Sequence, residues 1–149
     1  MGLTPARLRG IAEAVAPLLV FVDDDNVLAP DYLERAFEIF KRAPLIGAFG
    51  GSVVGEFEVE PKAWVYPHLG SLAIRSIEAE CWSNDPWDRR VTPYGAGMGV
   101  SADVAAAYAE QVKNDPLRRK LDRVGASLSS SGDTDLALTS CDVGKGMGN

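Results

Sequence analysis

The sequence predicts an α/β fold in which helices flank a sheet. The first observation is a continuous apolar run of strand length at residues 18–22, between two stretches with helical spacing. The second is that strand and helix patterns alternate along the chain, which is typical of α/β layer folds. The third is a length of 149 residues with 46% hydrophobic and 24% charged residues, which predicts one folded domain over residues 1–149.

The N-terminal elements follow from capping residues and apolar spacing. Thr4 before Pro5 predicts a helix start, because Thr caps helices and Pro fits the first helical position. The run at residues 18–22 has no polar face, so we expect a central, parallel strand that is covered on both sides. After Pro30 the apolar residues recur at spacings of three and four, which predicts a second helix.

The later elements are predicted from the same patterns. Glycines divide residues 45–54 into one or two strands, and the apolar spacing over residues 69–81 predicts a helix. Residues 56–67 and 82–93 are expected to be loops. Further helices are expected at residues 102–112 with Ser101 as cap, at 117–123, and at 133–143 with Gly144 as the stop, with a turn at 129–132 before the last.

The charge balance argues against general nucleic-acid binding. There are 15 Lys and Arg residues against 21 Asp and Glu, so the net charge of −6 repels a phosphate backbone, and we find no basic patch. An acidic chain can still bind nucleotide phosphates if a divalent cation lies between the two negative partners.

Signals for membranes, export and disulfides are not evident in the sequence. The longest apolar stretch, residues 14–22, is about half of the roughly 20 residues that span a bilayer, and Pro17 interrupts it. The N-terminus does not have the pattern of a signal peptide. Cys81 and Cys141 lie far apart, as in a reduced protein, and the single histidine, His68, excludes a multi-histidine zinc site. We therefore expect a cytoplasmic protein with no transmembrane segment. A location at the inner face of the membrane is compatible with this expectation.

Three consecutive aspartates follow the apolar run. In α/β folds, ligands bind outside the carboxyl ends of the strands. Because side chains alternate along a strand, Asp23 and Asp25 are expected to point to one side and Asp24 to the other. Two carboxylates on one side suit Mn²⁺ or Mg²⁺, and three adjacent acids repel one another. The pattern predicts a metal site at Asp25 and Asp23, and the alternative is a solvated turn that caps the next helix.

A phosphatase of the haloacid-dehalogenase type is a second interpretation of the same residues. Its D-x-D-x-[TV] pattern after a buried strand is matched by Asp23, Asp25 and Val27, and Gly132-Asp133 matches a later element. Asp23 would then be a phosphorylated nucleophile, with Asp25 as its acid/base partner.

A second pair of acids begins the last expected helix. The helix dipole alone favours Asp133 and Asp135 there, so N-terminal capping is the plain interpretation. Two positions on a helix differ by about 200°, so only one of these residues can face a given site. Asp133 lies nearer the turn and is the better candidate for a general base, whereas Asp135 is the secondary candidate and better suited to local anchoring.

A glycine-rich segment and two tryptophans precede the helix expected at residues 102–112. Gly95 and Gly97, on either side of Ala96, either bring the backbone close to a partner or form a tight turn, because glycine lacks side-chain bulk. Trp82 and Trp87 offer faces for stacking on an acceptor, although burial in a core is the commoner reason for tryptophan.

Five stretches, in this order, resemble the family 2 glycosyltransferases. They are TPARLRGI (4–11), LLVFVDDDNVLAPDYL (18–33), IGAFGG (46–51), PYGAGMGV (93–100) and SGDTDLAL (131–138). The resemblance implies a partial GT-A-type, Rossmann-like mixed sheet flanked by helices. It also implies metal-dependent, inverting glycosyl transfer from a nucleotide-sugar donor to the hydroxyl of a saccharide or lipid-linked acceptor.

The resemblance further implies roles for individual residues. Asp25 and Asp23 would hold Mn²⁺ or Mg²⁺, and the donor would be bound by Arg7, Asp23 and Asp24. Asp133 would be the catalytic base. The acceptor side would be formed by Gly95, Ala96 and Gly97, and we expect Trp82 and Trp87 nearby to help to shape it.

Two departures from the family pattern set further expectations. Gly132 stands where the acidic motif of the family usually has Glu. The first strands of the fold, which hold the nucleobase and ribose, have no counterpart, so we expect a catalytic domain truncated at its N-terminus and also at its C-terminus, with reduced or lost activity. A third interpretation is a non-enzymatic chain that associates with another copy through an exposed sheet edge.

Overall fold

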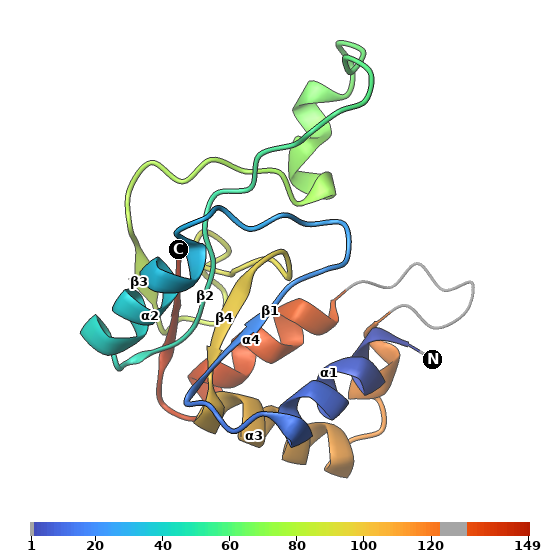
Figure 1. The fold of residues 1–149 in the computed structure, drawn as a ribbon. Coiled ribbons are helices and arrows are strands. Elements are labelled where there is room, and N and C mark those ends of the chain that lie inside the picture. The colour runs from blue at the N-terminus through green and yellow to red at the C-terminus, as the bar shows by residue number, and fades with distance from the viewer. Residues whose placement is uncertain (1, 123–130) are drawn as a thin grey trace.

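The computed structural model describes residues 2–122 and 131–149, which form a five-stranded mixed sheet with helices around it (Figure 1). The strand order is β1-β4-β2-β5-β3, and β2 and β5 are parallel while the other neighbouring pairs are antiparallel. The elements are α1 (Leu3–Glu13), β1 (Leu18–Phe21), α2 (Tyr32–Arg42), β2 (Ile46–Phe49), the 3-10 helix η1 (Tyr66–Leu72), β3 (Trp82–Ser83), β4 (Met98–Ser101), α3 (Ala102–Asn114), the 3-10 helix η2 (Arg118–Lys120), α4 (Gly132–Asp142) and β5 (Gly146–Gly148). The predicted α/β class and its four main helices are confirmed.

A row of paired residues crosses the sheet and forms one side of the core. Leu19 pairs with Val100, Val100 also pairs with Ala48, and Ala48 pairs with Met147. Paired residues point to the same face of a sheet, so this row faces one layer. That layer consists of α3 and α4, whose buried members in the same cluster are Val104, Ala105, Tyr108, Val112, Leu136 and Ala137.

Phe49 lies on the other face of the sheet between two glycines. It pairs with Gly99 of β4 and with Gly148 of β5. A side chain at Gly99 would overlap the Phe49 ring, so the missing side chain makes room for the aromatic ring. On this face Ile39 of α2 lines a pocket of about 210 Å³ together with Phe49 and Trp82.

The expectation of a central, parallel β1 is wrong. Among the described strands, β1 lies at an edge of the sheet, antiparallel to β4, and all four of its residues are only half-buried. Leu19 and Phe21 pack against the core from this edge. A short apolar run therefore fixed the presence of a strand, whereas its position depended on which distant segment offered hydrogen bonds.

The expected helix at residues 69–81 is also wrong. The chain there forms only η1, which has Pro67 in its first turn and ends at Leu72, before Ala73, whose backbone takes a positive φ of 59°. The segment then continues extended, with an isolated bridge between Val53 and Arg75. The segment between β2 and β3 thus forms an arm that projects from the body of the molecule (Figure 1).

Smaller expectations at the helix ends need correction too. Helix α1 begins at Leu3 after Gly2, and the Thr4 hydroxyl makes no capping bond but donates to Asp122. Ser101 precedes α3 without a side-chain capping bond. The helix expected at 117–123 is the single turn η2. Residue 123, and residues 129 and 130 of the turn expected at 129–132, lie outside the described residues.

Candidate active site

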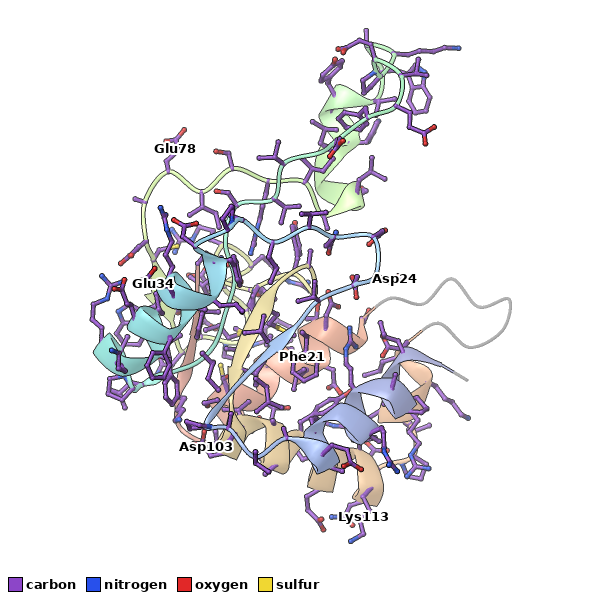
Figure 2. All side chains as sticks on the ribbon, in the orientation of Figure 1. Phe21, Asp24, Glu34, Glu78, Asp103 and Lys113 are labelled. Carbon is purple, nitrogen blue, oxygen red and sulfur yellow. The ribbon has the colours of Figure 1, made fainter. Side chains whose placement is uncertain are left out.

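The chain directions bring two predicted site segments to one end of the sheet. β1 runs antiparallel to β4, so the loop that leaves β1 and the segment that enters β4 meet at the same end. The first loop carries Asp23 and Asp24, and the second carries Gly95 and Gly97. Figure 2 shows Asp24 on the loop above β1, whereas Asp103 at the start of α3 marks the opposite end of the sheet.

Asp133 in the first turn of α4 is tied to the glycine-rich segment. Its Oδ2 accepts a hydrogen bond from the backbone N–H of Gly95 at 3.1 Å, and its Oδ1 accepts one from the N–H of Thr134 at 2.8 Å. The residue is half-buried. Each oxygen of a carboxylate can accept more than one hydrogen bond, so both retain capacity for a further donor. The carboxylate is therefore oriented but not saturated.

Asp23 lies within electrostatic reach of Asp133. Partial burial is the largest effect on Asp23 and raises its pKa above the ordinary value of 3.8. The Arg7 guanidinium acts in the opposite direction, while the carboxylates of Asp25, Asp133 and Asp24 raise the pKa further. The structure thus gathers four carboxylates and one guanidinium around the end of β1.

The carboxylates after β1 suit a hard divalent cation without forming a closed cage. Asp24 and Asp25 are exposed, Asp23 is exposed although part of its surface is covered, and the N–H of Asn26 donates to the Asp23 carbonyl at 3.1 Å in a turn. No group of three or more His, Cys, Asp or Glu side chains within residues 2–122 and 131–149 could hold a metal by itself. Mg²⁺ is usually bound by one or two carboxylates together with substrate phosphates, and these oxygen donors fit that mode.

Arg7 is held beneath this cluster by an ion pair. Its Nη1 donates to Asp122 Oδ2 at 2.9 Å, and both side chains are almost completely buried, at 6% and 3% exposure. Its Nη2 lies 3.5 Å from the point that a Cβ would occupy if residue 95 had a side chain. Arg7 therefore connects a buried acid to the loop that contacts Asp133.

Asp135 points to a different partner from Asp133. Arg118 Nη1 lies 3.3 Å from Asp135 Oδ1, and the buried Oδ2 has no hydrogen-bond partner among the described residues. Burial raises the pKa of Asp135, and the charge of Arg118 partly offsets this effect. The two acids thus occupy different surroundings, although they are separated by only one residue.

Tyr32 connects the loop after β1 to the glycine-rich segment. Its hydroxyl donates to the carbonyl of Gly97, and burial raises the pKa of Tyr32. Gly97 has a positive φ of 77°, which an L side chain rarely adopts, and a side chain there would crowd Leu28 and the Tyr32 hydroxyl. The shape of this segment therefore requires glycine at position 97.

Residues 1–109 match the family model described as Glycosyl transferase family 2. This match covers most of the chain and includes Asp23–Asp25 and Gly95–Gly97, but it ends before Asp133. The chain belongs to glycosyl transferase family 2. Together with the mixed sheet and its flanking helices, membership supports a partial GT-A-type fold. No curated protein and no solved structure matches the chain.

Family membership also bears on the other interpretations. It supports glycosyl transfer as the general activity and gives no support to the phosphatase interpretation of Asp23 and Asp25. In the part of this glycosyltransferase that the structure describes, no helix is long and apolar enough to cross a membrane. The expected self-association through an open sheet edge is also without support.

The two tryptophans of the glycosyltransferase lie on β3 and in the loop that follows it. Trp82 is on β3, at the opposite edge of the sheet from β1, which corresponds to roughly 20 Å across four strand spacings. Trp87 is 81% exposed in the loop that follows β3. The structure therefore does not bring Trp82 to the carboxylate cluster at the end of β1.

Three residues of the site were not singled out from the sequence. Asp122 holds Arg7, Tyr32 holds Gly97, and Arg75 supports the segment before Gly95. Arg75 donates to the Thr92 carbonyl at 2.9 Å, and its guanidinium lies 4.2 Å from the ring centre of Tyr94. No local pattern marks these residues, because each acts on a segment distant in sequence.

Proposed function

We propose that this chain binds a nucleotide-sugar donor and catalyses inverting transfer of the sugar to an acceptor hydroxyl, with Asp133 as general base. The observation that carries the proposal is the hydrogen bond from Gly95 to Asp133, next to the acidic loop after β1. This bond joins the candidate base to the candidate acceptor segment. The candidate donor site, on the loop after β1, lies at the same end of the sheet.

The base role of Asp133 rests on its placement. In inverting transfer, the acceptor hydroxyl loses its proton as its oxygen bonds to the anomeric carbon, while the bond from that carbon to the diphosphate breaks. The carboxylate of Asp133 would take this proton directly, which requires hydrogen-bond contact with the hydroxyl. Its bonds to Gly95 and Thr134 hold it in one orientation for that contact.

The donor side would consist of Asp23, Asp24 and Asp25, with Arg7 beneath them. Asp25 and Asp23 would hold Mn²⁺ or Mg²⁺, which supplies charge neutralisation for the leaving diphosphate when bound. The carboxylates of Asp24, Asp25 and Asp133 lie close enough to Asp23 to raise its pKa, although partial burial is the larger cause. Arg7 contributes positive charge at the same place.

The acceptor side would be formed by the segment from Gly95 to Gly97. The hydrogen bond from Gly95 to Asp133 supports this assignment, because it holds the segment directly beside the candidate base. Trp82 and Trp87 are exposed and remain candidates for a longer acceptor that extends across the sheet. A cytoplasmic location is part of the same proposal.

Calorimetric titration with nucleoside diphosphates tests the donor site. UDP, GDP, ADP, CDP and dTDP are each added to the chain with Mn²⁺ and again with EDTA. We expect one of them to bind only with Mn²⁺, and Asp25→Ala to abolish that binding. Glu34→Ala, which removes an exposed acid from α2, is the matched control and should leave affinity unchanged. Binding that does not respond to the metal, or no binding at all, contradicts the proposal.

A further inference from the structure

Asp122 is a buried acid for which the proposed reaction has no direct use. It is 2% exposed, and its Oδ2 accepts hydrogen bonds from the Thr4 hydroxyl at 2.7 Å and from Arg7 Nη1 at 2.9 Å. Both donors come from α1, more than a hundred residues earlier in the chain. A buried carboxylate needs such partners because desolvation of a charge is costly.

Asp122 also packs against the residue that precedes the candidate base. A side chain at Gly132 would overlap the carboxylate of Asp122. Gly132 is the first residue of α4, and Asp133 follows it directly. The position of Asp122 therefore constrains where the first turn of α4 can lie.

The guanidinium of Arg7 links Asp122 to the other side of the site. Its Nη1 donates to Asp122, and its Nη2 lies 3.5 Å from the point that a Cβ added at Gly95 would occupy. The same point is 3.5 Å from Asp133 Oδ2. A planar guanidinium held at one nitrogen has its other nitrogen fixed in direction as well.

We propose that Asp122 is a positioning residue, which holds Arg7 beside Gly95 and seats the first turn of α4 so that Asp133 meets the Gly95 N–H. This inference rests on the proposed function for its catalytic consequence. Its structural content, the placement of Gly95 and Asp133 by Asp122, does not depend on which sugar is transferred.

The first experiment measures placement without requiring activity. Backbone amide NMR signals of Gly95 and Thr134 report the two hydrogen bonds of Asp133. We expect both to move in Asp122→Ala, to move less in Asp122→Asn, which retains the shape, and to stay unchanged in the control Asp142→Asn. Folded Asp122 variants in which both signals match the wild type would overturn the proposal.

Gly132→Ala provides an independent test that removes no charge. Its methyl group would displace the Asp122 carboxylate, so we expect the same two amide signals to move although Asp122 and Arg7 are both present. This variant and Asp122→Asn decide the matter if Asp122→Ala does not fold. Unchanged signals in a folded Gly132→Ala variant count against the proposal.

The second experiment measures the catalytic consequence with the donor whose nucleotide binds in the calorimetric panel. We expect Asp122→Ala to lower kcat/KM by on the order of 10- to 100-fold, as misplacement of a catalytic group does. Arg7→Ala also removes positive charge from the donor side, so it should lower kcat/KM at least as much. Adding Asp122→Ala to Arg7→Ala should cost less than Asp122→Ala costs alone, because part of the effect of Asp122 passes through Arg7. Additive losses would overturn the proposal. If the wild type binds no nucleotide, the proposed function fails, while the NMR result still decides the role of Asp122.

Discussion

The backbone N–H of Gly95 donates a hydrogen bond to Asp133 across 38 residues of sequence, at 3.1 Å. This bond connects the segment that enters β4 with the first turn of α4. Gly95 is buried beside Asp133, and a Cβ added at Gly95 would lie 3.4 Å from the Cβ of Asp133. Substitutions can therefore separate chemistry at Asp133 from the geometry of this contact.

Asp133→Asn tests the base role. Asparagine keeps the size of the side chain but cannot take a proton, so we expect glycosyl transfer to fall by on the order of 10²- to 10⁴-fold. Binding of the nucleoside diphosphate should be retained, and both are measured by transfer kinetics and calorimetry. Asp142→Asn in the exposed last turn of α4 is the control. Unchanged transfer by Asp133→Asn would remove Asp133 from the mechanism.

Tyr32→Phe tests whether the hydroxyl of Tyr32 shapes the glycine-rich segment. The Gly97 carbonyl would lose its hydrogen bond, which should lower the free energy of unfolding by about 1 kcal/mol. Gly97→Ala should cost at least as much, because its φ of 77° lies in the left-handed region and disfavours a side chain by about 1–2 kcal/mol. Urea unfolding measures both. Gly51→Ala, where a side chain meets open space, should have a smaller effect.

The buried ion pair should matter far more to stability than an exposed one. Arg7→Ala leaves the carboxylate of Asp122 buried without its cation, which should cost about 3–5 kcal/mol. Arg9→Ala breaks the Arg9–Glu13 pair, whose side chains are 79% and 65% exposed, and should change stability by about 0.5 kcal/mol or less. Denaturant unfolding of the two variants compares them. Similar losses would show that burial does not govern the Arg7 pair.

The pair of Asp103 and Lys145 predicts a pH-dependent contribution to stability. Partial burial raises the pKa of Asp103, but hydrogen bonds from Lys145 and Ser101 and the charge of Lys145 outweigh it, and the pKa is lowered below 3.8. The contribution is therefore present above the unfolded-state pKa, near 3.8, and is lost as pH falls through the lower folded-state pKa.

Asp103→Asn measures this contribution. At pH 7 the variant should be less stable than the wild type by about 0.5 kcal/mol, a small value because the Asp103 side chain is 58% exposed. The difference should decrease below about pH 4 and vanish at lower pH, where the wild-type carboxyl is protonated. A difference that stays constant from pH 7 to pH 3 would contradict an electrostatic origin.

Several elements follow from local sequence alone. α2 and α4 have the apolar spacing or the terminal residues that were used to predict them, and α4 ends before Gly144, which has a positive φ of 78°. Neighbouring residues are sufficient here, because a helix makes its backbone hydrogen bonds within a few residues of sequence. The match to the glycosyltransferase family covers residues 1–109, a continuous stretch of sequence that includes the aspartates after β1.

Tertiary structure decided the position of β1 and the conformation of residues 69–81. A strand needs partners from elsewhere in the chain, and β4 supplied those of β1 on one side only among the described strands. Residues 69–81 had helical spacing but gained no buried face, so Ala73 ended the 3-10 helix and Arg75 paired with Val53 instead.

The candidate site also has one part that local sequence determines and another that depends on tertiary packing. The sequence by itself determined which acids follow β1 and begin α4, since strand ends and helix starts are read from adjacent residues. Only the tertiary structure decided that Asp133 meets Gly95 and that Asp122 holds Arg7, because a hydrogen bond between residues 38 or 115 positions apart depends on the packing of whole elements. Such contacts leave no local pattern, since each partner alone is an ordinary polar residue.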